Sequence, residues 1–242
     1  KLINMDIVTL EPYRVWEYYN QKCSITQAFD IEINKKGIRE LPKPTLRLNK
    51  EELLSGRQLV AEIKTKLKKD KVIVFQPFGR GIQHVDGSFV DSSNRSFEYK
   101  DIKQIIRRLQ EKGFGVIMMS EFAIDFTDAK FKDEVAMPEN VNIRVWAAII
   151  KYADQFLGCD SVGQHLAYSV DTKATVVTGS TVPINVSYPN AKGVKILDMG
   201  ELEREYVPIR IVPDERIDRK HEGIMAMNDE IIKLVIDTVT GK

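Results

Sequence analysis

The feature that most constrains the fold is a repeated alternation between short apolar runs and amphipathic patterns from residue 71 to residue 180. A continuous apolar run of this length is typical of a strand that is buried on both faces. The predicted strands are KVIVFQPFG (71–79), FGVIMMS (114–120), QFLGCD (155–160) and KATVVTGS (173–180). Burial on both faces requires a layer of helices on each side of the sheet.

Helical patterns fill the intervals between these strands. The predicted helices are YKDIKQIIRRLQEKG (99–113), VWAAIIKYAD (145–154) and SVGQHLAYSV (161–170). Single-helix crossovers between buried strands predict an α/β fold: a Rossmann-like parallel sheet with helices on both faces. In such sheets ligands bind beyond the carboxyl ends of the strands.

The flanking regions are less regular. Residues 194–200, 206–213 and 5–10 predict further strands, and 222–240 predicts an amphipathic closing helix. We interpret the cluster of Tyr13, Trp16, Tyr18 and Tyr19 as core. Two prolines in LPKPTLRL (41–48) favour an extended linker, and the following segment 49–70 predicts a helix with Asn49 as N-cap. A domain boundary is therefore expected near 41–50.

Composition excludes several classes of protein. Thirty-six Lys and Arg against thirty-five Asp and Glu give a net charge of +1, so no overall field recruits nucleic acid or an anionic membrane. Cys23 and Cys159 lack metal-site or disulfide-framework spacing. No apolar run reaches the roughly twenty residues of a transmembrane helix, and no leader pattern opens the chain. We expect a cytoplasmic protein and, because Lys1 opens the chain, a piece of a longer one.

The stretch GCDSVGQHLAYSV (158–170) passes from a strand through a turn into a helix. A helix start offers unpaired N–H groups and the positive end of the helix dipole, which favour phosphate. Gly163 would let a ligand approach the backbone, and His165 could donate to a phosphate oxygen or carry a positive charge. The alternative is structural: Asp160 or Ser161 as an ordinary N-cap, Gly163 as an ordinary turn residue, and His165 as a structural hydrogen-bonding residue. Spacing alone leaves both open.

The order of features resembles the C-terminal half of the family 9 glycosyltransferases, the heptosyltransferase-like enzymes of the GT-B fold. The matching pieces are QPFGRG (76–81), NRSFEYKDIKQII (94–106), VWAAIIKYADQFLGCDS (145–161) and DSVGQHLAYSV (160–170). The last piece is similar to the family's Asp-Ser/Thr-Gly-x-x-His signature. It departs from it at Val162, which stands where the family has Gly, with Gly163 one place later.

The resemblance implies a nucleotide-diphosphate-sugar donor, held without a metal or other cofactor. The residues implied to line the diphosphate and the donor sugar are Asp160, Ser161, Gly163, Gln164, His165, Arg95, Gly79 and Arg80. Glu121 is implied to contact the nucleoside. The heptosyltransferase likeness favours an ADP-linked donor, and a glycan or lipid-linked acceptor. The sequence shows no Asp-x-Asp motif that would hold Mg²⁺ between phosphates.

The family's catalytic base lies in an N-terminal domain, so the resemblance assigns no catalytic residue here. It implies that 1–45 is the remnant of that acceptor domain with its linker, and that 46–242 is the nucleotide-sugar-binding domain. Two alternatives remain. One is another GT-B enzyme, such as a sugar epimerase or a phosphorylase-like enzyme, and the other is a non-catalytic binding or assembly protein.

Several candidate residues also have purely structural interpretations. Arg80 and Arg95 could be solvated surface arginines. Trp146 is interpreted as core rather than as a base-stacking platform, and His84 and His221 as surface residues. The basic run KTKLKKDK (64–71) is interpreted as the solvated face of a helix.

Overall fold

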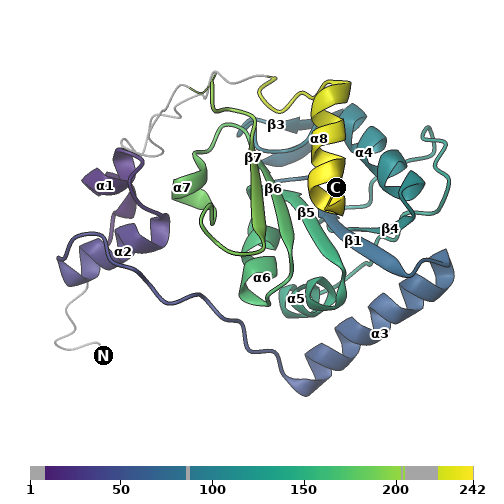
Figure 1. Ribbon diagram of the computed structural model, residues 1–242, viewed down its shortest axis with the longest axis horizontal. Coiled ribbons are helices and arrows are strands. Elements are labelled where there is room, and N and C mark those ends of the chain that lie inside the picture. Colours follow the sequence, from purple (N-terminus) through teal and green to yellow (C-terminus); the bar gives the residue numbers. More distant parts are fainter. Residues whose placement is uncertain (1–8, 86–87, 203, 205–222, 242) are drawn as a thin grey trace.

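The computed structural model describes residues 9–85, 88–202, 204 and 223–241 (Figure 1). The strand predicted at 206–213, residues 5–8 of the strand predicted at 5–10, and His221 lie outside the described residues. Thr9 and Leu10 belong to neither a helix nor a strand.

Within these ranges the centre of the molecule is a parallel sheet of five strands in the order β4-β1-β5-β6-β7. The strands are β1 (Lys71–Gln76), β4 (Phe114–Met118), β5 (Gln155–Cys159), β6 (Ala174–Thr178) and β7 (Val194–Asp198). The chain passes from β1 to β4 on one side and then to β5 on the other. The sheet therefore has a switch point at the carboxyl end of β1, which is where open α/β sheets bind ligands.

Helices cover both faces of the sheet, as the sequence predicts. One core joins the sheet to α4 (Tyr99–Glu111) and α8 (Asp229–Thr240), and takes Ile73 and Phe75 from β1. The other takes Val72 and Val74 and joins the sheet to α3 (Lys50–Leu67), α5 (Ile143–Tyr152) and α6 (Val162–Ser169). The alternation along β1 follows from the two-residue period of a strand. Trp146 is buried in the second core, as expected.

The helix starts explain two boundaries. Asn49 caps α3 as predicted, because its side chain accepts from the Glu52 amide at 2.8 Å. The last helix begins at Asp229 rather than at 222, so the prediction there is wrong for the first turns. Asn228 caps α8, and the buried Asp101 carboxylate accepts the Met227 amide at 3.0 Å. The Met227 amide is therefore bonded to a side chain and not to the carbonyl of a preceding helical turn. The Met227 side chain is nevertheless buried in the core.

The helices α3 and α5 pack closely at Gly56. A Cβ built there would lie 2.4 Å from the Ala148 Cβ, so only glycine fits at this crossing.

The basic run 64–71 lies at the end of α3 and beyond it, where Lys64 and Lys69 pair with Asp154 and Asp133. In the described ranges, no helix combines the length and apolar content needed to cross a membrane.

The N-terminal segment forms a small helical unit beside α7 (Pro183–Val186) (Figure 1). It contains η1 (Pro12–Arg14), α1 (Trp16–Tyr19) and α2 (Ile25–Asn34). Asn185 joins it to α7, because its Nδ2 donates to the carbonyl oxygens of Tyr18 and Cys23 at 3.0 and 2.9 Å. Residues 35–49 that follow contain neither helix nor strand, which agrees with an extended linker.

The aromatic cluster of this unit is only partly core. Tyr18 is buried, but Trp16 is 61% exposed and Tyr19 39% exposed. The interpretation of these two residues as core is therefore wrong. The α1 helix has only four residues, so it has one inward face and leaves its other side chains in solvent. Lys22 covers part of the exposed indole, with its Nζ 4.1 Å from the ring centroid of Trp16.

A hairpin of β2 (Ile82–Val85) and β3 (Ser88–Asp91) follows β1 and was not expected from the sequence. Its anchor is Phe89, whose ring stacks on Phe78 and Phe122 at centroid distances of 5.1 and 5.6 Å. His84 is exposed, as predicted, and stacks on the same ring. The hairpin is thereby held at the carboxyl edge of the parallel sheet.

Candidate functional site

A cavity of about 1100 Å³ opens at the carboxyl ends of β1, β4 and β5. Seven of the nine predicted site residues line it: Gly79, Arg80, Arg95, Glu121, Asp160, Ser161 and His165. Gly163 and Gln164 do not line it, and support it from behind. A smaller, open hollow of about 410 Å³ lies by Trp16 and Glu32 and has no such convergence of polar groups from several strands. The carboxyl-edge cavity is therefore the candidate site.

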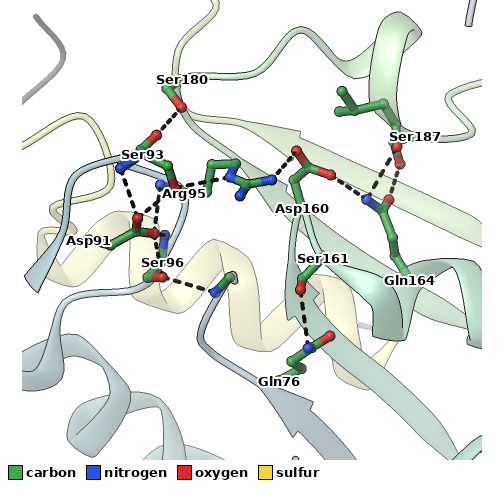
Figure 2. A network of polar contacts seen from close by, with 12 residues as sticks. Gln76, Asp91, Ser93, Arg95, Ser96, Asp160, Ser161, Gln164, Ser180 and Ser187 are labelled. Atoms are coloured by element: carbon green, nitrogen blue, oxygen red, sulfur yellow. Dashed lines mark hydrogen bonds and ion pairs between the residues drawn. The ribbon is translucent and has the colours of Figure 1, made fainter. Parts of the chain in front are cut away.

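Asp160 follows β5 and is 5% exposed. Its Oδ1 accepts from Gln164 Nε2 at 2.8 Å, and its Oδ2 lies 3.6 Å from Arg95 Nη1 (Figure 2). Arg95 thus balances the buried carboxylate and turns toward the cavity. Its side chain is only 26% exposed, so it is not a plain surface arginine. An ion pair of 3.6 Å is beyond the range of a hydrogen bond, which leaves guanidinium N–H groups for another anion.

A loop organised by Asp91 holds Arg95 in place, and the sequence interpretation missed it. The Asp91 carboxylate accepts from the Ser93 and Ser96 amides at 2.8 and 3.0 Å and from both hydroxyls (Figure 2). Ser96 Oγ in turn accepts the Gly79 amide at 2.9 Å. Burial raises the pKa of Asp91, but the hydrogen bonds from Ser93 and Ser96 and the Arg95 charge outweigh it, so the pKa is lowered. The Asp-x-Ser spacing is a signal for such a turn.

The start of α6 differs from the predicted N-cap. Ser161 occupies the N-cap position, but its side chain caps no amide. Gln76 from β1 does so instead: its Oε1 accepts the Gly163 amide at 2.8 Å, and its Nε2 donates to Ser161 Oγ at 3.2 Å. The Gly163 amide is therefore already paired. Because Ser161 accepts from Gln76, its own proton is left to donate to a group in the cavity.

Gly163 faces protein rather than the cavity. A Cβ there would lie 2.4 Å from Gln76 Oε1 and 2.6 Å from the Phe156 ring. The glycine lets α6 pack against the sheet, which is a different role from the close ligand approach expected. Val162, the departure from the family pattern, is 41% exposed and lines the cavity.

Gln164 joins Asp160 to the segment after β6. It is 1% exposed, its Nε2 donates to Asp160 and to the Val186 carbonyl, and its Oε1 accepts from Ser187 Oγ at 2.6 Å (Figure 2). All its polar groups are therefore used within the protein. It holds the Asp160 carboxylate and is not available to a ligand.

His165 lies one turn into α6, and its Nδ1 is 2.8 Å from the Tyr188 hydroxyl. Desolvation by the surrounding protein lowers the pKa of His165, and the nearby Asp160 carboxylate opposes this. A pKa below 6.5 favours the neutral ring at pH 7 in the free protein, whereas the sequence interpretation also considered a positive charge. A neutral imidazole still carries one N–H donor.

The end of the cavity at β4 mixes apolar and polar side chains. Its wall contains Met118, Met119, Met137 and Trp146, and also Glu134, Glu139 and Asn140. The segment that carries Met137 runs beside the edge of the sheet, where the Ala136 amide donates to the Val116 carbonyl at 3.0 Å. Glu121 is exposed at the rim of this end. Within the described residues, no group of three or more His, Cys, Asp or Glu side chains could hold a metal ion.

Known structures share this architecture. A family 9 glycosyl transferase from Veillonella parvula matches with a TM-score of 0.64 and 9% identity, over 89% of this chain and 59% of that one. The ADP-heptose lipopolysaccharide heptosyltransferase II of E. coli matches with a TM-score of 0.50 and 12% identity, over 78% and 57%. The chain has the fold of the family 9 glycosyltransferases.

A third match to the family 9 fold is the iron-containing dodecameric glycosyltransferase TibC of enterotoxigenic E. coli. Its TM-score is 0.51 at 12% identity, over 91% of this chain and 54% of that one. The chain thus spans little more than half the length of these structures. No protein-family model and no curated protein matches the chain. At such low identity the likeness to family 9 is one of fold.

Proposed function

We propose that the cavity binds a nucleotide-diphosphate sugar, and that the chain is the donor-binding half of a metal-independent glycosyltransferase. One observation carries the proposal: Arg95, Ser161 and His165 lie together at one end of a cavity whose other end contains methionine and tryptophan side chains. A cation and two neutral donors suit a diphosphate, and the methionine and tryptophan side chains suit a flat nucleobase. The site lies at the switch point of the sheet, where such ligands bind.

The polar end of the cavity is the proposed diphosphate site. Arg95 is held in place, because its Nε donates to Ser93 Oγ at 3.0 Å, and its 3.6 Å pairing with Asp160 leaves other guanidinium N–H groups for a phosphate. Gln164 meanwhile holds the Asp160 carboxylate. Ser161 and His165 add one O–H and one N–H donor. Gly79 and Arg80 form the opposite wall, and Arg80 is exposed at its rim.

The end of the cavity at β4 is the proposed nucleoside site. Met118, Met119 and Met137 can adapt to a planar ring, because methionine side chains are flexible and polarisable. The Glu121 carboxylate at the rim would accept hydrogen bonds from ribose hydroxyl groups. The resemblance to heptosyltransferases favours adenine as the base and a heptose as the sugar.

Transfer of the sugar leaves negative charge on the departing diphosphate. The Arg95 guanidinium and the donors of Ser161 and His165 are fixed before the reaction, so they would stabilise this charge at little reorganisation cost. The acceptor, a glycan or a lipid-linked sugar, needs a general base to remove its hydroxyl proton. We assign this base to an N-terminal domain, with 1–45 as its last part and 46–242 as the donor domain.

Titration calorimetry with ADP, UDP, GDP and CDP tests the proposal. We expect one nucleotide to bind selectively and His165→Ala to weaken it roughly ten- to hundred-fold, because a hydrogen bond to a charged group contributes about 1.5–3 kcal/mol. His84→Ala is the matched control, because His84 is exposed on the hairpin outside the cavity. Absence of binding at millimolar nucleotide, or equal binding by His165→Ala, would contradict the proposal.

Turnover of the matching nucleotide sugar by the full-length protein then tests the reaction. Transfer predicts product only when an acceptor is present. Product formed without any acceptor would instead indicate an epimerase of the same fold. Binding without turnover in either case would indicate a non-catalytic protein.

A further inference from the structure

Tyr188 contacts His165 and is not one of the residues that line the cavity. Its ring meets the imidazole edge-on, with centroids 5.5 Å apart and planes at 86°. Tyr168 stacks on Tyr188, with ring centroids 3.9 Å apart and ring planes at 28°. Lys43 of the linker adds a contact, with its Nζ 4.7 Å from the Tyr168 centroid. These contacts fix the direction of the Tyr188 hydroxyl toward His165 Nδ1.

The hydrogen bond between Tyr188 and His165 has a defined direction. In a neutral imidazole one nitrogen donates and the other accepts, and the partner of one nitrogen decides which. A phenol hydroxyl is a strong donor, whereas its oxygen is a poor acceptor because its lone pair is delocalised into the ring. The favoured direction for the 2.8 Å contact is therefore donation from the Tyr188 O–H to Nδ1. Burial raises the pKa of Tyr188 to about 12, so the hydroxyl keeps its proton.

The remaining proton of the ring then belongs to Nε2. Among the described residues Nε2 has no hydrogen-bond partner, and His165 lines the cavity beside Ser161. We propose that Tyr188 is a positioning residue that holds His165 in its Nε2–H tautomer and presents this N–H to the cavity. That the N–H meets a diphosphate rests on the proposed function, whereas the tautomer does not.

Nitrogen-15 NMR of the full chain without ligand tests the tautomer directly. The chain has only three histidines, so His165 is identified by the signal that disappears in His165→Ala. At pH 8 we expect the wild-type ring to show a protonated Nε2 and an unprotonated Nδ1. Tyr188→Phe keeps the stacked ring and removes only the hydroxyl, and we expect the two nitrogen shifts to move toward each other as both tautomers become populated.

Tyr168→Phe is the matched control, because it removes the hydroxyl of the neighbouring ring and keeps the stack on Tyr188. We expect it to leave the His165 shifts unchanged. A wild-type ring protonated at Nδ1 would overturn the inference. So would a Tyr188→Phe variant, folded by its amide spectrum, whose His165 shifts equal those of the wild type.

Titration with ADP separates this inference from the proposed function. We expect Tyr188→Phe to raise the Kd for ADP roughly three- to ten-fold, as for the weakening of one charge-assisted hydrogen bond, and Tyr168→Phe to leave it unchanged. If His165→Ala weakens ADP binding but Tyr188→Phe does not, the inference fails and the function stands. If the NMR shifts behave as expected but no nucleotide binds, the positioning role stands and the proposed function fails.

Discussion

Two helices, α5 and α6, start at the same cavity and are built differently. Asn142 caps α5 within its own segment, since its Oδ1 accepts the amides of Arg144 and Val145 at 3.0 Å. The first turn of α6 is completed from outside, because Gln76 of β1 accepts the Gly163 amide. Residues at both starts line the cavity, so location alone does not explain the difference.

The N-terminal ends of α5 and α6 differ in which side chains they leave available for binding. The cap of α5 is local and uses its polar side chain for stability. At α6, Gln76 takes over the capping role, and Tyr188 takes one nitrogen of His165. In the proposed site, Ser161 and His165 are thereby held as donors toward the cavity. We infer that α5 positions the apolar wall, whereas α6 is the part built for an anion.

The largest effect on stability is expected for Gly163→Ala. The new Cβ would lie 2.4 Å from Gln76 Oε1 and 2.6 Å from the Phe156 ring, so Gln76, the Phe156 ring or α6 itself must shift. Overpacking of this kind costs about 1–3 kcal/mol, or a fall in Tm of roughly 3–10 °C for a chain of this length. Thermal unfolding measures it. Val162→Ala, at the exposed neighbour, should change Tm little; equal shifts in the two variants would refute the packing role.

Ser161→Ala should affect binding and leave stability nearly unchanged. The Ser161 side chain caps no amide and accepts only a 3.2 Å bond from Gln76 Nε2, so its removal should cost about 1 kcal/mol or less in the free protein. Loss of one donor to a diphosphate should raise the Kd for ADP roughly ten-fold. Calorimetry and thermal unfolding of the same sample measure both quantities. A large loss of stability with unchanged affinity would reverse the roles assigned to the two helix starts.

Asn142→Ala should give the opposite result. It removes the acceptor for the Arg144 and Val145 amides, and loss of an N-cap costs about 1 kcal/mol. Denaturant unfolding should show this loss, with ADP affinity within about two-fold of the wild type. Asn142→Ser, which restores a capping oxygen, should recover most of the stability. A variant that is stable but does not bind ADP would break the comparison.

The smallest effect is a pH dependence at α6. The pKa of His165 is lowered from 6.5 on folding, mainly by desolvation, so the unfolded chain binds more protons between the two pKa values. The free energy of unfolding therefore keeps its full His165 contribution above about pH 6.5 and decreases as the pH falls below this value. His165→Gln should lose this dependence. Unfolding of both proteins between pH 8 and 5 measures it, and a difference that is constant with pH would contradict the assignment.

The sequence predicts the layers of the fold because burial on both faces leaves continuous apolar runs, as in β1 and β4. It also places Asp160, Ser161 and His165 together, because they follow one strand. It does not predict Gln76 or Tyr188 as their partners, since these meet α6 through hydrogen bonds over 85 and 23 residues. Nor does periodicity distinguish Ile224 and Met227 in a buried loop from the same residues on a helix, because both are core.

The most direct test compares backbone amide NMR shifts on titration with ADP and with adenosine. The two probes share base and ribose, so the difference between their spectra reports the diphosphate alone. We expect this difference to be concentrated at Ser161–His165 and Arg95, and to be small at Asn142–Trp146. A difference concentrated at the start of α5, or spread equally over both helix starts, would contradict the claim that α6 forms the diphosphate site.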